Sequence, residues 1–134
     1  GAGHAPPDQA AIVAKNLGRL GERGGLPPRD APAYKLVLPQ KVSAQWAYPN
    51  GWAPLHFFVT KGLERYKYNT EAKRVALKWL KTNLDHFTDY GVFLEKYNVV
   101  DPAKLPAEGL YPSQTGFGWT NAIFERFCQE YIDK

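Results

Sequence analysis

Two apolar stripes at helical spacing, separated by a two-residue break, constrain the fold of this chain most. Apolar residues recur every three or four positions from 54 to 68, and the same spacing returns from 70 to 90. Asn69-Thr70 interrupts the pattern and Gly91 ends it. A short break between two amphipathic helices predicts an antiparallel helical hairpin. The stripes consist of Leu55, Phe58, Val59, Gly62, Leu63 and Tyr66, then Val75, Ala76, Trp79, Leu80, Leu84 and Phe87.

The ends of the chain predict two further helices. After Pro7-Asp8, apolar residues at helical spacing indicate a helix that Gly24-Gly25 terminates. Near the C-terminus, Thr120 or Asn121 is expected to cap a last helix. We therefore expect an all-α domain of about four helices over residues 7–134, preceded by a flexible N-terminus at 1–6.

Long loops connect the predicted helices. Four prolines between 26 and 40 exclude a regular helix there, although residues 34–38 can form a short extended piece. Residues 92–100 are rich in aromatic and β-branched side chains, which favours extended backbone over helix. The Pro-rich segment at 45–54 is expected to be irregular, with Pro54 in the first turn of the next helix.

Composition excludes several classes of function. No apolar run approaches the roughly 20 residues of a membrane-spanning helix, so we expect a soluble protein. The net charge of +4 is spread along the helices without a dense basic run, which gives no support for nucleic-acid binding. His56 and His86 have no carboxylate or cysteine at ligand spacing, and the lone Cys128 lies on an apolar helix face. We expect no metal and no cofactor.

The segment at 45–54 (QWAYPNGWAP) has the composition of a sugar site. Indole faces stack on the apolar faces of a pyranose, and amide side chains hydrogen-bond its hydroxyls. We therefore take Gln45, Trp46 and Asn50 as candidate sugar-binding residues. Trp46 and Trp52 can equally fill the junction between the loop and the next helix. Trp119, further along, is open to the same two interpretations.

Three segments, in order along the chain, read QWAYPNGWAP (45–54), FLEKY (93–97) and YPSQTGFGWTN (111–121). Each is similar to a motif of the C-terminal part of trehalases, and similar helices lie between them. Their joint occurrence in this order makes the resemblance specific. It runs from about residue 25 to the end, and more loosely through the first helix. The sequence therefore resembles the trehalase family.

This resemblance implies a fold and a reaction. The implied fold is a partial (α/α) toroid, an arc of helical hairpins whose loops at one end form a pocket for α,α-trehalose. Trehalases hydrolyse this disaccharide to two glucoses with inversion, which takes an acid and a base on opposite faces of the scissile bond. Carried over by motif, Glu95 matches the general base, and Lys96 beside it would help to hold it ionised. The family's general acid and its arginine-rich sugar contacts lie upstream of this chain.

Some positions depart from the family's motifs. Ala47 replaces the aspartate of the second signature, Leu110 stands where a glycine-rich turn and a glutamate precede the Tyr-Pro pair, and Asn98 follows Tyr97 where aspartate is common. Loss of two polar groups from a sugar pocket predicts weaker binding, because each unpaired buried hydroxyl costs roughly 1–3 kcal/mol. Without its acid partner, Glu95 can equally be a surface carboxylate that pairs with a nearby lysine.

Three functions remain open. In the first, the chain is not catalytic on its own and acts as a structural or interaction subunit, with other protein chains covering the flank of the incomplete toroid. In the second, it is the C-terminal part of a split or processed inverting trehalase whose companion supplies the acid. In the third, it binds trehalose or another sugar without hydrolysis. The lack of methionine suggests a processed chain, and a basic processed chain favours an organelle such as the mitochondrion over secretion.

Overall fold

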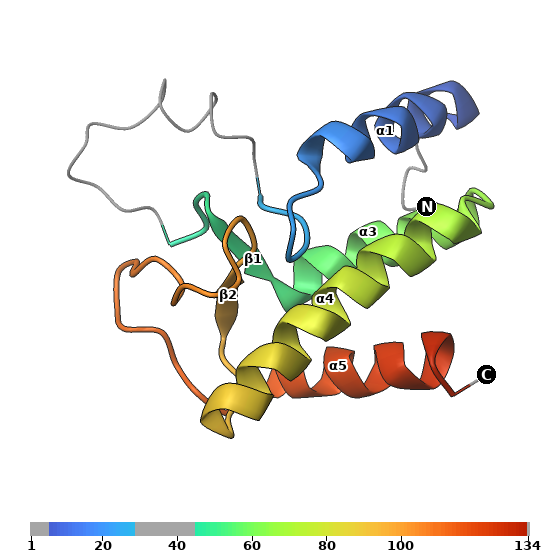
Figure 1. Ribbon diagram of the computed structural model, residues 1–134. Coiled ribbons are helices and arrows are strands. Elements are labelled where there is room, and N and C mark those ends of the chain that lie inside the picture. Colours follow the sequence, from blue (N-terminus) through green and yellow to red (C-terminus); the bar gives the residue numbers. More distant parts are fainter. Residues whose placement is uncertain (1–5, 29–44, 134) are drawn as a thin grey trace, which may run out of the picture.

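The computed structural model describes residues 6–28 and 45–133, which contain four helices and a two-stranded ribbon. The order along the chain is α1 (Pro7–Leu20), β1 (Asn50–Trp52), α3 (Ala53–Arg65), α4 (Asn69–Tyr90), β2 (Lys96–Asn98) and α5 (Gly118–Tyr131). Helices α3, α4 and α5 pack against one another, and the ribbon lies near one end of them (Figure 1). None of the described helices combines the length and the apolarity that a membrane crossing requires.

The predicted hairpin is confirmed as α3 and α4. Pro54 occupies the first turn of α3, where its missing N–H costs no hydrogen bond. Helix α3 ends at Arg65, three residues before the predicted boundary, because the backbone of Lys67 turns left-handed with φ 67°. Gly91 closes α4 in the left-handed region, and its N–H donates to the Phe87 carbonyl at 2.7 Å.

The predicted boundaries of the outer helices were wrong by a few residues. Helix α1 stops at Leu20, and Gly21 rather than Gly24-Gly25 follows its last turn. Helix α5 begins at Gly118, with Phe117 in the N-cap position, so Thr120 lies inside its first turn. Tertiary contacts use the residues that were expected to cap these helices. Gly24 donates its N–H to the Val99 carbonyl, and the side chain of Thr120 is buried. The extended piece expected at 34–38 lies outside the described residues.

The extended conformation predicted for 92–100 is confirmed in part by β2. It pairs antiparallel with β1 in the register Asn50↔Asn98, Gly51↔Tyr97 and Trp52↔Lys96. Strand β1 falls in the segment that was expected to be irregular. A further bridge joins Leu94 to Thr115. These short pairings bring the three motif segments together at one end of the helices.

Two apolar clusters hold the helices. The larger one is built around Trp79 of α4, which is fully buried, and joins α3, α4, α5 and the ribbon. The smaller one fixes α1 through Leu17, which packs with Leu63 of α3 and Val75 of α4. Fully burying one such side chain contributes about 1.5–3 kcal/mol, so these clusters dominate the stability of the fold. The larger cluster contains Ala53, Ala76, Trp79, Leu80, Leu94, Tyr97, Val99 and Phe127.

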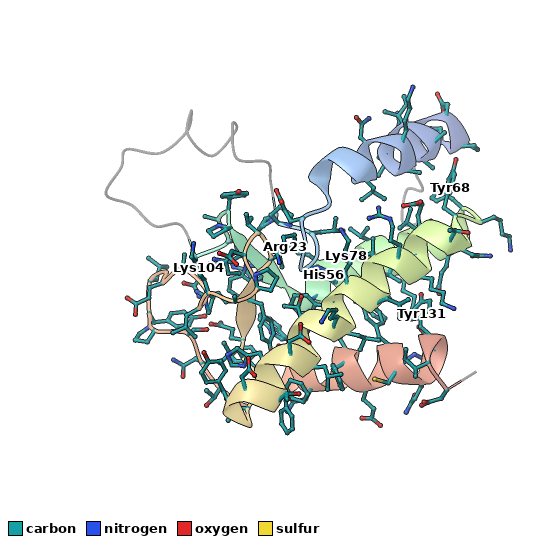
Figure 2. All side chains as sticks on the ribbon, in the orientation of Figure 1. Arg23, His56, Tyr68, Lys78, Lys104 and Tyr131 are labelled. Atoms are coloured by element: carbon teal, nitrogen blue, oxygen red, sulfur yellow. The ribbon has the colours of Figure 1, made fainter. Side chains whose placement is uncertain are left out.

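His56 of α3 joins β1 and the loop after α1 in the interior. Figure 2 labels its position. Its Nδ1–H donates to the Trp52 carbonyl at 2.8 Å, and its Nε2 accepts the Leu26 N–H at 2.8 Å. The ring also stacks on Trp79 with centroids 4.0 Å apart. Burial lowers the pKa of His56 from 6.5 to about 4, against the opposing effect of the Trp52 hydrogen bond.

Stability should therefore fall as the pH drops from 6.5 towards 4. Above pH 6.5, His56 is neutral in both the folded and the unfolded chain, and below that value only the unfolded chain binds the proton. At about 1.4 kcal/mol per pH unit, the unfolding free energy should drop by about 3 kcal/mol over this interval because of His56. Denaturant titrations at a series of pH values measure this slope. His56→Gln should flatten it, and equal slopes in wild type and His56→Gln would contradict the assignment.

Candidate active site

Glu95 lies where the three motif segments meet, and its side chain is fully buried. Its backbone N–H donates to the Gln114 carbonyl at 2.8 Å. Its own carbonyl faces the Trp119 Nε1–H at 3.4 Å and the Thr120 hydroxyl at 3.5 Å. The loop before α5 and the first turn of α5 therefore fix the backbone of Glu95 from two sides. The alternative in which Glu95 is a surface carboxylate does not hold.

Only one of the two carboxylate oxygens of Glu95 has a hydrogen-bond partner among the described residues. The hydroxyl of Tyr111 donates to Oε1 at 2.6 Å, whereas the buried Oε2 has no hydrogen-bond partner among the described residues. The hydrogen bond to Glu95 raises the pKa of Tyr111, so the phenol stays a donor. Buried polar atoms are nearly always paired in proteins, and one that is not often marks a functional position. Oε2 is thus an unpaired acceptor, and a general base needs an acceptor that no other group occupies.

Lys96 lies next to this carboxylate and is also fully buried. Its ammonium has no hydrogen-bond partner among the described residues and lies 5.3 Å from the centre of the Trp52 ring and 6.0 Å from that of Tyr111. Burial lowers the pKa of Lys96, and the charges of Glu95 and Glu108 act in the opposite direction. The aromatic faces stabilise the cation in place of water. No ion pair within 4 Å joins Lys96 to Glu95 in the described part of the chain.

Three tryptophans gather beside Lys96 and the backbone of Glu95. Trp46 stacks on Trp52 with ring centroids 4.0 Å apart and an angle of 19° between the planes. Trp119 meets both rings edge-on, at 6.0 Å from Trp46 and 6.1 Å from Trp52. Trp52 is fully buried, whereas Trp46 is 43% exposed. Trp52 therefore serves the core, and Trp46 offers surface to a ligand.

The two candidate amides have different roles in the structure. Gln45 accepts the Leu110 N–H at 2.9 Å through Oε1, while its buried Nε2 has no partner among the described residues. Both ends of the Asn50 amide are used by the backbone of Ala107, each at 2.9 Å. Asn50 thus closes a loop and is not open to a ligand, whereas Gln45 keeps a free donor.

Tyr111 is the site residue that the sequence analysis did not single out. It belongs to the Tyr-Pro pair that opens the third motif segment, and its hydroxyl donates to Oε1 of Glu95. Of the departures from the family pattern, Leu110 precedes Tyr111 and is 79% exposed, whereas Ala47 is buried. Gln45, Trp46, Glu95 and Trp119 come together here, and Asn50 supports the loop behind them.

The chemistry of this site suits a polyhydroxylated ligand. A free carboxylate oxygen accepts a hydroxyl or water proton, and the free nitrogens of Gln45 and Lys96 donate to hydroxyl oxygens. Trp46 adds an aromatic face for the C–H side of a sugar ring. Within residues 6–28 and 45–133, no group of His, Cys, Asp and Glu side chains is arranged to hold a metal ion.

Comparison with known proteins gives the family. The trehalase family model matches residues 2–132. The cytosolic neutral trehalase of Beauveria bassiana is 41% identical over 135 residues, which cover 92% of this chain and 18% of the relative. The probable trehalase of rice, Oryza sativa, is 40% identical over 90 residues, or 65% of this chain and 16% of the relative.

A solved structure agrees with the sequence matches. Neutral trehalase Nth1 from Saccharomyces cerevisiae superimposes with a TM-score of 0.76 at 33% identity, covering 96% of this chain and 21% of the yeast chain. The all-α fold is therefore a partial (α/α) toroid, as the resemblance implied. The chain spans only 18% of the length of the Beauveria relative. On the family model, the sequence identities and the shared fold, this chain belongs to the trehalase family.

Proposed function

We propose that this chain does not hydrolyse trehalose on its own and acts as part of a larger trehalase-type assembly. Inverting hydrolysis takes two carboxyl groups about 6.5–9.5 Å apart, on opposite faces of the scissile bond. Among the described residues, Glu95 is the one buried carboxylate, and it is the observation that carries the proposal. General acid assistance contributes about 10²–10⁴ in rate, so half of the pair leaves the chain essentially inactive.

Exposed apolar side chains support the assembly. Ile12 and Val13 of α1 are 60% and 56% exposed, and Phe58 of α3 is 69% exposed. A groove of about 160 Å³ lies between these two helices and is lined by apolar side chains, Leu17 and Val59 among them. Apolar surface of this kind is usually covered by another protein surface. In a complete toroid, neighbouring helices would occupy this flank.

The proposal is tested with the purified chain. Glucose release from trehalose should not exceed that of a buffer blank, and the chain isolated from its source should have the native mass of a complex. Monomeric behaviour in native material, or enzyme-like glucose release by the chain alone, would contradict it.

The unpaired Oε2 of Glu95 favours a second candidate, in which the assembly is catalytic. A water held at Oε2 would give one proton to Glu95 while its oxygen bonds to the anomeric carbon of trehalose. The bond from this carbon to the bridging oxygen breaks, and an acid from the companion segment protonates that oxygen. Tyr111 holds the other carboxylate oxygen, which aims Oε2 at the water.

A chimera tests this candidate. This chain would replace the segment that it matches in the cytosolic neutral trehalase of Beauveria bassiana. We expect the folded chimera to release glucose from trehalose, because the relative supplies the missing carboxyl group. A chimera that folds but releases no glucose would contradict the catalytic candidate and leave the structural one.

A further inference from the structure

A second cavity, of about 500 Å³, shares no lining residue with the Glu95 site. Three segments far apart in the sequence bound it: the loop after α1 with Arg23, the C-terminal half of α4, and the loop after β2 with Lys104. Figure 2 shows Arg23, Lys78 and Lys104 on these three segments. Its volume falls in the range of about 300–1,000 Å³ that is typical of small-molecule sites.

Direct contacts fix the three segments to one another. The hydroxyl of Thr82 in α4 donates to the Gly24 carbonyl at 2.9 Å, and the Gly24 N–H donates to the Val99 carbonyl at 2.7 Å. A Cβ at Gly24 would lie 2.7 Å from Pro102 and 2.8 Å from the Thr82 hydroxyl. The walls of the cavity are therefore held in place by close packing and need no ligand to form.

The lining carries more positive than negative charge. Its cations are Arg23, Lys78, Lys81 and Lys104, and its anions are Asp85 and Asp89. The ammonium of Lys81 lies 2.8 Å from a carboxylate oxygen of Asp85, and that of Lys104 lies 3.0 Å from a carboxylate oxygen of Asp101. Arg23 makes no ion pair with the described residues.

Lys78 is the least solvated of these cations. Its ammonium donates to the Glu22 carbonyl at 2.7 Å, and burial followed by the charge of Arg74 lowers its pKa. A bound anion would relieve both effects by adding an opposite charge. The pair formed by Arg23 and Lys78 is thus suited to a small dianion.

The C-terminal end of α4 adds hydrogen-bond acceptors to the lining. His86 donates its Nδ1–H to the Val92 carbonyl at 3.1 Å, which leaves Nε2 as an acceptor, and this buried atom has no partner among the described residues. Asp89 adds a carboxylate. Acceptors select hydroxyl groups, and the carboxylates disfavour a polyphosphate by like-charge repulsion.

We propose that this cavity binds a small phosphate ester that carries hydroxyl groups, such as a hexose phosphate. Arg23 and Lys78 would hold the phosphate, and Lys104, whose ammonium also contacts Asp101, would add a third positive charge; His86 and Asp89 would accept protons from the hydroxyls. This site does not depend on the function proposed above. The chain would bind such an ester whether or not the Glu95 site is catalytic.

Calorimetric titration of the purified chain with glucose 6-phosphate tests the proposal. We expect saturable binding that Arg23→Gln/Lys104→Gln weakens by at least about tenfold, since each charged hydrogen bond is worth about one decade in affinity. The matched control Arg65→Gln/Lys73→Gln removes two exposed cations outside the lining and should leave binding unchanged. Equal loss of affinity in both double variants would overturn the proposal. So would the absence of binding at about 10 mM ester, which is about the weakest affinity worth assigning to a site.

The hydroxyl part of the ligand has its own test. His86→Phe keeps an aromatic ring but removes the free Nε2 acceptor, together with the Nδ1–H that donates to the Val92 carbonyl. It should weaken glucose 6-phosphate about fivefold and leave inorganic phosphate unchanged, because one neutral hydrogen bond is lost. Glucose itself should not bind measurably. Inorganic phosphate binding as tightly as the ester to the wild-type chain would contradict the assignment of a hydroxyl-bearing ester.

Discussion

Gly25→Ala should destabilise the chain by about 3–5 kcal/mol, because two penalties act at one position. Gly25 has φ +145°, a conformation that residues with a side chain rarely adopt. A Cβ there would also lie 2.2 Å from Nε2 of His56, the atom that accepts the Leu26 N–H. The buried ring cannot move without losing its stacking on Trp79. Denaturant unfolding followed by tryptophan fluorescence measures the loss.

Gly18→Ala is the matched control for this substitution. Gly18 lies inside α1, and nothing would come within 4 Å of its new Cβ. Because alanine favours a helix over glycine, this variant should be neutral or up to about 1 kcal/mol more stable. If both alanine variants unfold at the same denaturant concentration, the junction of Gly25 with His56 does not have the role described here.

Glu95→Gln should lower glucose release by the Beauveria chimera about 10²–10⁴-fold, with little change in fold stability. Glutamine keeps the shape of the side chain and an oxygen for the Tyr111 hydroxyl, but it cannot take a proton from water. The loss should appear in kcat, because the carboxylate acts on water in the chemical step. Initial rates at saturating trehalose give this number.

Glu125→Gln removes a carboxylate of the same type from the exposed face of α5 and is the control. It should keep the rate of the chimera within about twofold, in line with surface substitutions elsewhere. A chimera whose rate survives Glu95→Gln would show that another group activates the water. Equal losses in the two variants would point to a general effect on folding.

The sequence predicted the helical hairpin well, because that part of the fold depends on local signals. The spacing of apolar residues and Gly91 define α3 and α4 without any long-range contact. The predicted break at Asn69-Thr70 was wrong, because these residues form the first turn of α4 and the chain turns at 66–68, where Lys67 has φ 67°. The end of α1 was misplaced because Gly24-Gly25 serves the contacts with Val99 and His56 rather than a helix cap. Strand β1 was missed because its partner, β2, lies beyond two helices in the sequence.

In the candidate site, too, the sequence indicated the residues with local signals and not their long-range contacts. Motif segments indicated Glu95, Trp46 and Gln45, which the structure brings together. Their partners could not be predicted, because the contact of Tyr111 with Glu95 and the use of Asn50 by the Ala107 backbone depend on how two loops close. The cationic cavity beside α4 gave no sequence signal, since its lysines and arginine are spread over distant segments.

Glucose release from α,α-trehalose by the purified chain, with no other protein present, tests the central claim most directly. With Glu95 as the one buried carboxylate of the described residues, we predict a rate equal to that of a buffer blank. Turnover at about 1 s⁻¹ or faster, the range of ordinary enzymes, would show that the chain contains a complete hydrolytic site and would contradict the account.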